Sequence, residues 1–583
     1  MNRAISLAYW ENLGTSELNI IKIVEFLGGT VRLVRLTTEV ARHPDSDKAF
    51  LTKSNCLITS AQALANLRKE IHGTMELLTC LADPGAKVFI YGFEPVSGHD
   101  SLLRELTAGA LVAVEPSPAA NRRIDVASDH ICRQLSGLSF EVPGTDEQYA
   151  FVQGSARASF TPVMSIEQKP LCVHIKSERC ETVLTTSGRI ADLDAVADPG
   201  ASVLDAFTGL APLLIFLYGS LREYLWHNDS PTACFIVDDP LLKRRYGCLN
   251  YKKLLALMDR KRFSASIAFI PWNCKRSQRQ VVESFAGRPM SLCVHGCDHT
   301  GREFGGNDSV MLRQKARQAL ERMKLHRSLS GLDFDDVMVF PQGIFSTTAM
   351  SALKSCGYLA AVNSTVFPVD AGHTLTLRDL LQPAVTRYSN LPLFTRWYPH
   401  QFSELAFNLF LGKPSLIVEH HGYFSQGYDA LAETIEKVHR LDSRLQWSNP
   451  ATICSRACWK RVAEDGDVHI LFFTDRFELR NETSSPQKYV LIRHGLSEPD
   501  TAVTINGRRV NVRQDGVGLR VQLLLGGGEA AEIRVEGGQP EVVVPHPAPR
   551  PMYQVGVFIR RCLSEFRDNY WDMNPFVSRN RQG

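Results

Sequence analysis

The sequence has neither the charge imbalance of a nucleic-acid-binding protein nor the long apolar runs of a membrane protein. Its 65 Lys and Arg residues nearly balance 62 Asp and Glu residues, for a net charge of +3 over 583 residues. This balance gives no overall attraction to nucleic acid or to acidic membranes, so neither is expected as a partner. The longest uncharged run, residues 206–221, is shorter than the roughly 20 residues that span a bilayer. It predicts a buried helix, with a membrane-associated segment as the alternative.

The cysteines lack the dense, regular spacing of a disulfide scaffold. Fourteen are scattered between Cys56 and Cys562, which predicts reduced, buried thiols and a cytoplasmic protein. The first ten residues hold one basic residue and a short apolar stretch without a small-residue cleavage site, so no signal peptide is expected. The composition, 44% hydrophobic and 22% charged, is that of an ordinary globular protein.

Residues 1–200 carry the first of about three or four domains expected for this length. A helix is expected over residues 60–78. Strands are expected at residues 5–9, 31–36, 56–59, 88–91, 111–114 and 149–153. This alternation predicts a Rossmann-like or amidotransferase-like α/β domain with a mostly parallel sheet. Because it lacks both a Gly-x-Gly-x-x-Gly turn and a Gly-x-Cys-x-Gly elbow, we expect a binding or structural role and not dinucleotide or amidotransferase chemistry.

A second series of βα units covers residues 201–460. Its expected helices are residues 251–262, 310–326, 347–356 and 428–441. Its expected strands are residues 234–237, 267–270, 292–294, 337–340, 359–362 and 416–419. Repeated βα units that close on themselves predict a TIM-like (β/α) barrel, whose chemistry collects at the carboxyl ends of the strands.

The pattern of expected helices and strands changes again near the C-terminus. Residues 465–545 alternate short strands with turns such as Asn506-Gly507, which predicts a β-sandwich. A proline-rich linker at residues 540–551 leads into a C-terminal helix and tail, residues 551–583. We expect this helix to dock on the body of the protein, with a membrane-surface helix as the alternative. Its apolar residues recur at helical spacing: Ile559, Leu563, Phe566 and Tyr570.

An acid pair, Asp238 and Asp239, directly follows the expected strand at residues 234–237. Two carboxylates this close repel each other and raise each other's pKa, which is usually tolerated only when a cation or a proton is shared. The alternative is a solvated turn, since Asp before Pro240 is common in loops.

Two histidines, His295 and His299, follow the strand expected at residues 292–294. On a helical turn a spacing of four places both imidazoles on one face. Two imidazoles and one carboxylate leave an open coordination position, as in catalytic zinc sites. The alternatives are a pair of histidines with structural partners and a structural zinc site that uses Cys293 and Cys297, whose spacing is not that of the usual Cys-x-x-Cys knuckle.

Taken together, these strand ends resemble the polysaccharide deacetylase (NodB-homology) family over residues 233–446. The family's acid-pair motif is matched by residues 235–239, and its His-x-x-x-His motif by the two histidines above. Pro341-Gln342-Gly343 resembles its proline-containing substrate loop. Residues 416–421 resemble its late strand ending in Leu-x-His, where strand alternation favours His420 over His421.

The resemblance implies a deformed TIM-like barrel and a metal-dependent hydrolase that removes the acetyl group from an N-acetylated sugar or polysaccharide. The implied roles are general base for Asp238, general acid for His420, and ligands of a divalent metal, expected to be Zn²⁺, for Asp239, His295 and His299. The implied partner is a carbohydrate or small amide. Its expected contacts are Pro341, Gln342, Gly343 and Trp272, with Trp397 and Tyr398 as further aromatic candidates.

Three departures from the family pattern bear on the substrate and on activity. Pro240 replaces a glycine after the acid pair, Val339 stands near where an arginine often holds the base, and an Asp-x-x-Asp-Trp motif is missing. A deacetylase-like barrel that binds carbohydrate without turning it over is therefore the alternative, and hydrolysis of a different bond is a third. The sequence does not predict an oligomeric state.

Overall fold

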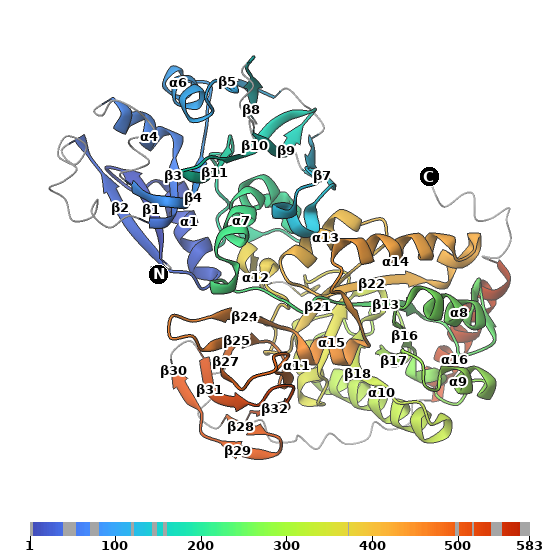
Figure 1. Cartoon of the computed structure of the whole chain (residues 1–583). Helices are drawn as coiled ribbons and strands as arrows, with labels where there is room; N and C mark the ends of the chain where they lie inside the picture. The colour runs from blue at the N-terminus through green and yellow to red at the C-terminus, as the bar shows by residue number, and fades with distance from the viewer. Residues whose placement is uncertain are drawn as a thin grey trace.

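The structure is a computed structural model that describes residues 4–38, 54–69, 81–117, 122–142, 149–155, 160–370, 372–495, 501–515, 518–537 and 551–571. Figure 1 shows three regions, with the N-terminal region at the upper left, a barrel at the right and the C-terminal sheets at the lower left. Three expected segments lie wholly or mostly outside the described residues: the end of the first helix (residues 70–78), the proline-rich linker and the C-terminal tail.

Seven parallel strands close into a barrel, which confirms the fold predicted for the central region. β13 hydrogen-bonds to β16 on one side and to β22 on the other, and these two pairings complete the ring. In order around the barrel the strands are β13 (Thr232–Asp238), β16 (Ala265–Phe269), β17 (Met290–His295), β18 (Asp335–Val339), β19 (Ala360–Asn363), β21 (Leu393–Trp397) and β22 (Ser415–His420). A short strand, β23 (Gln446–Trp447), pairs with the start of β13.

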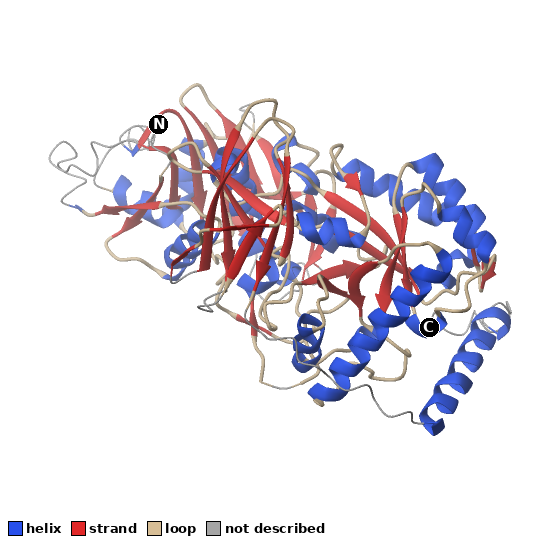
Figure 2. Ribbon diagram, turned by 90° about the horizontal axis from the view of Figure 1, so that it is seen from below, coloured by secondary structure: helices blue, strands red, loops and turns tan. Residues whose placement is uncertain are grey.

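The helices of this region surround the barrel, as the blue helices at the right of Figure 2 show. In α14, Leu431, Ile435 and Val438 are buried at helical spacing, which is the apolar face that docks on the strands. The helices are α8 (Tyr251–Lys261), α9 (Arg279–Phe285), α10 (Ser309–Ser330), α11 (Thr347–Ser355), α12 (Leu377–Leu381), α13 (Phe402–Phe410), α14 (Asp429–Leu441) and α15 (Pro450–Arg456).

Strand β21 was not predicted from the sequence. Thr395 and Arg396 interrupt its apolar residues, so it has neither a continuous apolar run nor a clear alternation. It is a strand because it pairs in parallel with β19 on one side and β22 on the other. This pairing brings Arg396 into the barrel, where it is 3% exposed.

The N-terminal region is built on a nine-stranded sheet. In order its strands are β2 (Val31–Leu36), β1 (Ile5–Trp10), β3 (Ser54–Ser60), β4 (Ala82–Tyr91), β11 (Cys180–Thr185), β10 (Lys169–Lys176), β9 (Thr161–Ile166), β6 (Arg122–Val126) and β7 (Ser139–Val142). A separate pair is formed by β5 (Leu111–Pro116) and β8 (Tyr149–Gln153). The described helices include α1 (Thr15–Phe26), α4 (Ala61–Arg68) and α6 (Ser97–Leu106).

The expectation of a mostly parallel sheet is wrong for half of this region. The neighbours from β2 to β11 are parallel, but those from β11 to β7 are antiparallel. Glu167 and Gln168, at φ 48° and 67°, form the two-residue connection between β9 and β10. A connection this short joins only antiparallel strands. The pair lacks the Asn-Gly or Gly-rich signal of such turns, so the sequence did not reveal it.

The apolar run at residues 206–221 forms α7 (Phe207–Leu221), a largely buried helix, as predicted. By length and composition alone the longer helical segment Val203–Tyr224 could cross a membrane, but most of it lies inside the structure. The Phe216 ring lies 5.2 Å from that of Phe89 in the N-terminal sheet, and the Phe207 ring lies 5.1 Å from that of Phe407 on α13. The helix therefore packs between the N-terminal region and the barrel.

The C-terminal region has two sheets that share one apolar cluster, to which Leu491 contributes from one sheet and Ile533 from the other. One sheet orders β24 (Cys458–Val462), β25 (Val468–Phe472), β27 (Gln487–His494), β31 (Gly518–Leu525) and β30 (Arg513–Asp515). The other orders β26 (Arg476–Arg480), β32 (Ala530–Glu536), β28 (Ala502–Ile505) and β29 (Arg508–Val510). Asn506 and Gly507, both at positive φ, make the predicted turn between β28 and β29. The last described helix is α16 (Pro551–Phe566).

Candidate metal centre

The structure brings Asp239, His295 and His299 together at the carboxyl ends of the barrel strands. The Oδ1 atom of Asp239 lies 3.2 Å from Nε2 of His295 and 3.0 Å from Nε2 of His299. One ligand atom from each residue lies within 4.8 Å of the others. Asp239 directly follows β13 and His295 ends β17, so two strands separated only by β16 deliver them to the same place.

The backbone around these side chains adopts conformations that are rare for residues other than glycine. Asp239 has φ 78° and His299 has φ 57°. Each such residue costs about 1–3 kcal/mol and persists only where its surroundings impose it. Gly296, at φ 62°, leaves no room for a side chain, because a Cβ there would lie 2.4 Å from Cγ of Pro341. The turn after β17 thus needs glycine at this position to bring the two histidines together.

The hydrogen bonds at this centre suit a bound cation. Nδ1 of His295 lies 3.0 Å from the Val339 carbonyl oxygen, to which it donates. This contact leaves Nε2 of the neutral ring with a lone pair directed at Asp239. Within the described residues, the buried Oδ1 atom of Asp239 has no hydrogen-bond partner. The Oδ1 atom of Asp239 and the Nε2 atom of His295 repel each other at this distance unless a cation or a proton lies between them. One carboxylate with two imidazoles is a set of ligands that divalent zinc accepts.

Asp238 is buried and paired with an arginine. It is 2% exposed, and its two carboxylate oxygens accept hydrogen bonds from Nη1 and Nη2 of Arg396, each 2.7 Å long. Burial alone would raise the pKa of Asp238, but the Arg396 guanidinium outweighs it and holds that pKa below its usual value. Asp238 is therefore a carboxylate at neutral pH, in the state that a base requires.

Arg396 is a candidate site residue that sequence reasoning missed. Val339 on β18 stands near where the family that the motifs resemble often has an arginine, and the arginine that pairs with Asp238 here comes from β21, two strands further around the barrel. Val339 contributes its backbone carbonyl to His295. A single arginine within a mostly apolar, strand-length segment was the signal that could have revealed it, because a charge there has to find a buried partner.

His420 lies on the same side of the barrel as Asp238. Its Nε2 atom is 4.0 Å from Oδ2 of Asp238, and its side chain is 47% exposed. His421 points away from this centre, and its Nε2 atom lies 3.7 Å from Oδ1 of Asp568. Burial lowers the pKa of His421, but contact with Asp568 outweighs this effect and raises the pKa to about 9. The structure therefore places His420, and not His421, beside Asp238, as strand alternation predicted.

A buried glutamate that the sequence did not reveal organises the loop carrying His299. Glu303 accepts hydrogen bonds from the backbone N–H groups of Cys297, Asp298 and His299 at 3.0, 2.9 and 3.1 Å. Lys315 Nζ lies 2.9 Å from the same carboxylate. Three backbone donors and one ammonium on one carboxylate fix the loop, and with it the position of the His299 ring.

Cys297, Asp298 and Glu303 form a second cluster with metal-ligand chemistry. Their oxygens already have partners: Glu303 as described above, and Asp298 through Arg322 at 2.6 Å and Tyr553 at 2.7 Å. We therefore interpret this cluster as a network of compensated charges. Cys293 belongs to neither of the metal-ligand groups found among the described residues, so the alternative zinc site built from Cys293 and Cys297 is not formed there.

The expected substrate residues divide into two groups. Pro341 is buried against Gly296, and Gln342 accepts a hydrogen bond from the Arg302 backbone, so the loop at residues 341–343 lies beside the metal-ligand loop. Trp272 packs on α16 instead, with its ring 6.2 Å from that of Phe558 and beneath the Arg276 guanidinium. A role for its ring in substrate binding stays a prediction.

The C-terminal helix docks on the loops at the carboxyl ends of the barrel strands, at the right of Figure 1. Glu565 forms ion pairs with Lys243, after β13, and with Arg276, after β16. Tyr553 donates to Asp298, next to the candidate metal ligand His299. The helix thus lies across the loops that carry the site. Several of its apolar side chains are nevertheless exposed, such as Leu563 with an exposed fraction of 64%.

No family model matches this chain, and no curated protein matches it. Several solved structures are similar to it. The carbohydrate deacetylase Agd3 is 10% identical, with 91% of this chain and 98% of that chain covered and a TM-score of 0.44. A putative polysaccharide deacetylase from Mycobacterium smegmatis is 14% identical over 39% of this chain and 90% of that chain, with a TM-score of 0.27. A CE4 family pseudoenzyme from Bacillus anthracis is 8% identical over 39% and 66%, with a TM-score of 0.25. Polysaccharide deacetylases, the family that the motifs resemble, are thus also among the similar solved structures.

Proposed function

We propose that this protein is a metal-dependent hydrolase of a carbon–nitrogen amide bond, and that it deacetylates an N-acetylated sugar or polysaccharide. The observation that carries the proposal is the pairing of Asp238 with Arg396 next to the group of Asp239, His295 and His299. A buried carboxylate kept ionised by a bidentate arginine, beside three residues that would hold a divalent cation and leave a coordination position for water, is what amide hydrolysis by an activated water requires.

Asp238 is the general base of the proposed reaction. Its carboxylate accepts a proton from the water that attacks the acetamide carbonyl carbon. Arg396 is a positioning residue: its two hydrogen bonds fix the orientation of the carboxylate and keep it charged before the proton arrives. A divalent metal held by Asp239, His295 and His299 would act as a Lewis acid on the carbonyl and acidify the attacking water.

His420 is the general acid. As the carbon–nitrogen bond breaks, the leaving nitrogen needs a proton, and His420 is the imidazole next to Asp238 whose exposed side chain can reach a bound substrate. The products are acetate and a free amino sugar. The proton that Asp238 takes from water and the proton that His420 gives to nitrogen balance the hydrolysis.

The alternative of carbohydrate binding without turnover loses its main support. It rested on the absence of an arginine for the base, and Arg396 fills that role from β21. The bond that is hydrolysed and the identity of the sugar remain part of the proposal.

Acetate release tests this function directly. The full-length protein, loaded in turn with Zn²⁺, Co²⁺ or Ni²⁺, is incubated with N-acetylated hexosamine oligomers and acetylated xylan, and free acetate is measured. We expect release from at least one N-acetylated substrate, its loss in Asp238→Asn, and normal release in the control Asp333→Asn, whose carboxylate is 89% exposed. Absence of acetate from every substrate, with metal bound, would refute the proposal.

A further inference from the structure

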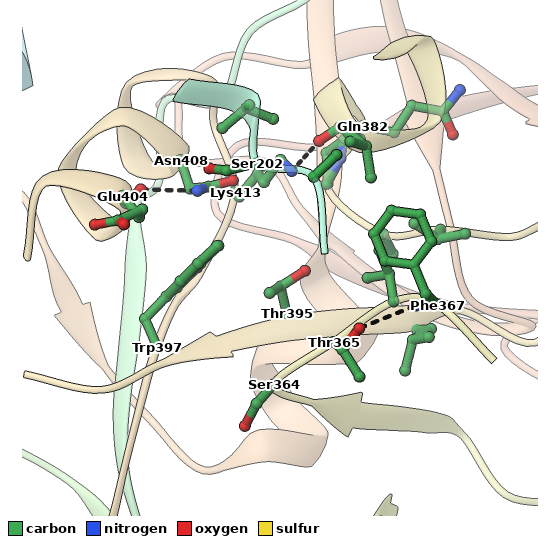
Figure 3. A pocket seen from close by; sticks show the side chains of 18 of the residues that line it. Ser202, Ser364, Thr365, Phe367, Gln382, Thr395, Trp397, Glu404, Asn408 and Lys413 are labelled. Atoms are coloured by element: carbon green, nitrogen blue, oxygen red, sulfur yellow. Dashed lines mark hydrogen bonds between the residues drawn. The ribbon is translucent and has the colours of Figure 1, made fainter. Parts of the chain in front are cut away.

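A pocket of about 270 Å³ lies behind strand β21, outside the metal centre. Thr395 and Trp397 line it, while Arg396 between them reaches Asp238, as alternation along a strand requires. Ser202, from the segment that joins the N-terminal region to α7, forms part of its wall. The pocket therefore lies where the N-terminal region meets the barrel, and boundaries between regions are common places for ligands. Figure 3 shows it from close by.

One buried side chain in this pocket has an unused hydrogen-bonding atom. Asn408 on α13 is 2% exposed, and its Nδ2 atom donates to the Glu404 carbonyl oxygen at 2.7 Å. Its Oδ1 atom has no partner among the residues that the structure describes. Because a buried amide oxygen is almost always hydrogen-bonded, a donor from a ligand or a water is missing here.

A buried lysine stands in the same pocket. Lys413 is 7% exposed, and its Nζ atom donates to the Leu380 carbonyl oxygen. Burial lowers the pKa of Lys413 to about 7, so the amine at neutral pH exists both with and without its extra proton. It can therefore donate to a ligand oxygen and also accept from a ligand hydroxyl.

The remaining wall supplies an aromatic ring, neutral polar groups and the carboxylate of Glu404. Trp397 is partly exposed, and Figure 3 shows its ring extending beside Glu404 and Thr395. Gln382 and Gln401 also line the pocket. An apolar ring face next to groups that both donate and accept hydrogen bonds is complementary to a sugar ring, which has C–H faces and hydroxyls of both kinds.

We propose that this pocket binds one ring of a carbohydrate, at a site separate from the metal centre. Asn408 Oδ1 accepts from one hydroxyl, Lys413 Nζ contacts another, and Trp397 packs against the ring face. Ser364 connects the two sites, since it lines the pocket and its Oγ atom lies 3.3 Å from Nε of Arg396. The inference does not depend on hydrolysis at the metal centre.

Saturation-transfer NMR and calorimetry on the full-length protein test this site. The probes are N-acetylglucosamine, galactose, xylose and glucuronic acid, with acetate as an anion control. We expect at least one neutral sugar to bind. Lys413→Met and Asn408→Leu should each weaken that binding about tenfold, the effect of one lost hydrogen bond to a ligand. The control Lys437→Met, on an exposed lysine, should bind as the wild type does.

Two further variants keep the test decisive. Thr395→Val is nearly isosteric, so it reports on the pocket even if a core variant fails to fold, and we expect it to weaken binding severalfold. The double variant His295→Ala with His299→Ala should bind the sugar normally, which separates this site from the metal centre. The proposal is overturned if no neutral sugar binds, if glucuronic acid and acetate alone bind, or if the folded pocket variants bind like the wild type.

Discussion

The two sides of the proposed active site are held very differently. On the metal side, the loop carrying His299 is fixed by three backbone hydrogen bonds to Glu303, and His295 is fixed through the Val339 carbonyl. On the acid side, the His420 side chain is 47% exposed, and its Nε2 atom lies 4.0 Å from Oδ2 of Asp238.

This difference indicates which groups act before substrate arrives. The proposed metal ligands and the proposed base are positioned by the protein itself, as a metal centre requires. His420, at 47% exposure, is not fixed by burial in this way. Changes on the metal side should therefore alter metal binding and stability, whereas changes at His420 should alter turnover alone.

The largest effect is expected from Arg396→Met. The change leaves Asp238 as a buried carboxylate without its partner, which typically destabilises a protein by about 3–5 kcal/mol. It also raises the pKa of Asp238, so the acid limb of the pH–rate profile should move to higher pH. Chemical unfolding and a pH–rate profile measure the two effects.

The pH dependence of stability sharpens this prediction. The pKa of Asp238 in the folded wild type is below its ordinary value. Its pairing therefore stabilises the protein fully above the unfolded pKa of about 3.9, and this stabilisation is lost as the pH falls through the lower folded value. The stability gap between wild type and Arg396→Met should be largest near neutral pH and should shrink in acid. Equal gaps at all pH values would show that Arg396 acts through packing, and Arg396→Lys, which keeps the charge, is the matched comparison.

The next largest effect is expected on catalysis from His420→Gln. Loss of a general acid typically lowers kcat about 10²- to 10⁴-fold. Metal content and thermal stability should stay at wild-type values, because His420 is held by few contacts. His421→Gln is the matched control, since that ring faces Asp568 and not Asp238. Loss of metal in His420→Gln would break the proposed division between the two sides.

A smaller effect is expected from Glu303→Gln. The neutral amide no longer attracts three backbone N–H groups and Lys315 as the carboxylate does, so the His299 loop loosens. Metal affinity should fall about tenfold or more, as for other groups that orient a ligand, whereas kcat with saturating metal should change little. Competition with a chelating dye measures the affinity, and Glu321→Gln, on an exposed position of α10, is the control. An unchanged affinity would mean that the loop is held by other contacts.

The smallest effect is expected from Tyr553→Phe. It removes the hydrogen bond that Tyr553 donates to Asp298 and the one that it accepts from Lys315, and it should destabilise the protein by about 1 kcal/mol. A thermal melt measures this change. A large loss of metal affinity would instead show that the helix is essential to the metal loop.

The sequence predicted the parts of the site that are local. Asp238, Asp239, His295 and His299 stand in short motifs at strand ends, and alternation within one strand was enough to choose His420. Arg396 lies 158 residues from Asp238 in the chain, and only the closure of the barrel brings them together. Glu303 was missed because three of its four partners, all except Lys315, are backbone groups, which leave no mark in the sequence.

The fold, like the site, could be predicted only in part. Regular βα alternation revealed the barrel, but β21 was hidden by its polar residues and takes its form from its neighbours. In the N-terminal region, one turn at Glu167 and Gln168 without the usual turn residues reverses the direction of the chain, and the antiparallel half of the sheet follows from such connections.

The most direct test of the central claim is the metal content of the purified protein. Elemental analysis of the wild type should find one divalent metal per chain, and the double variant His295→Ala with His299→Ala should contain none while remaining folded. A wild type without stoichiometric metal after loading, or a double variant that still holds it, would contradict the assignment of Asp239, His295 and His299 as the metal centre.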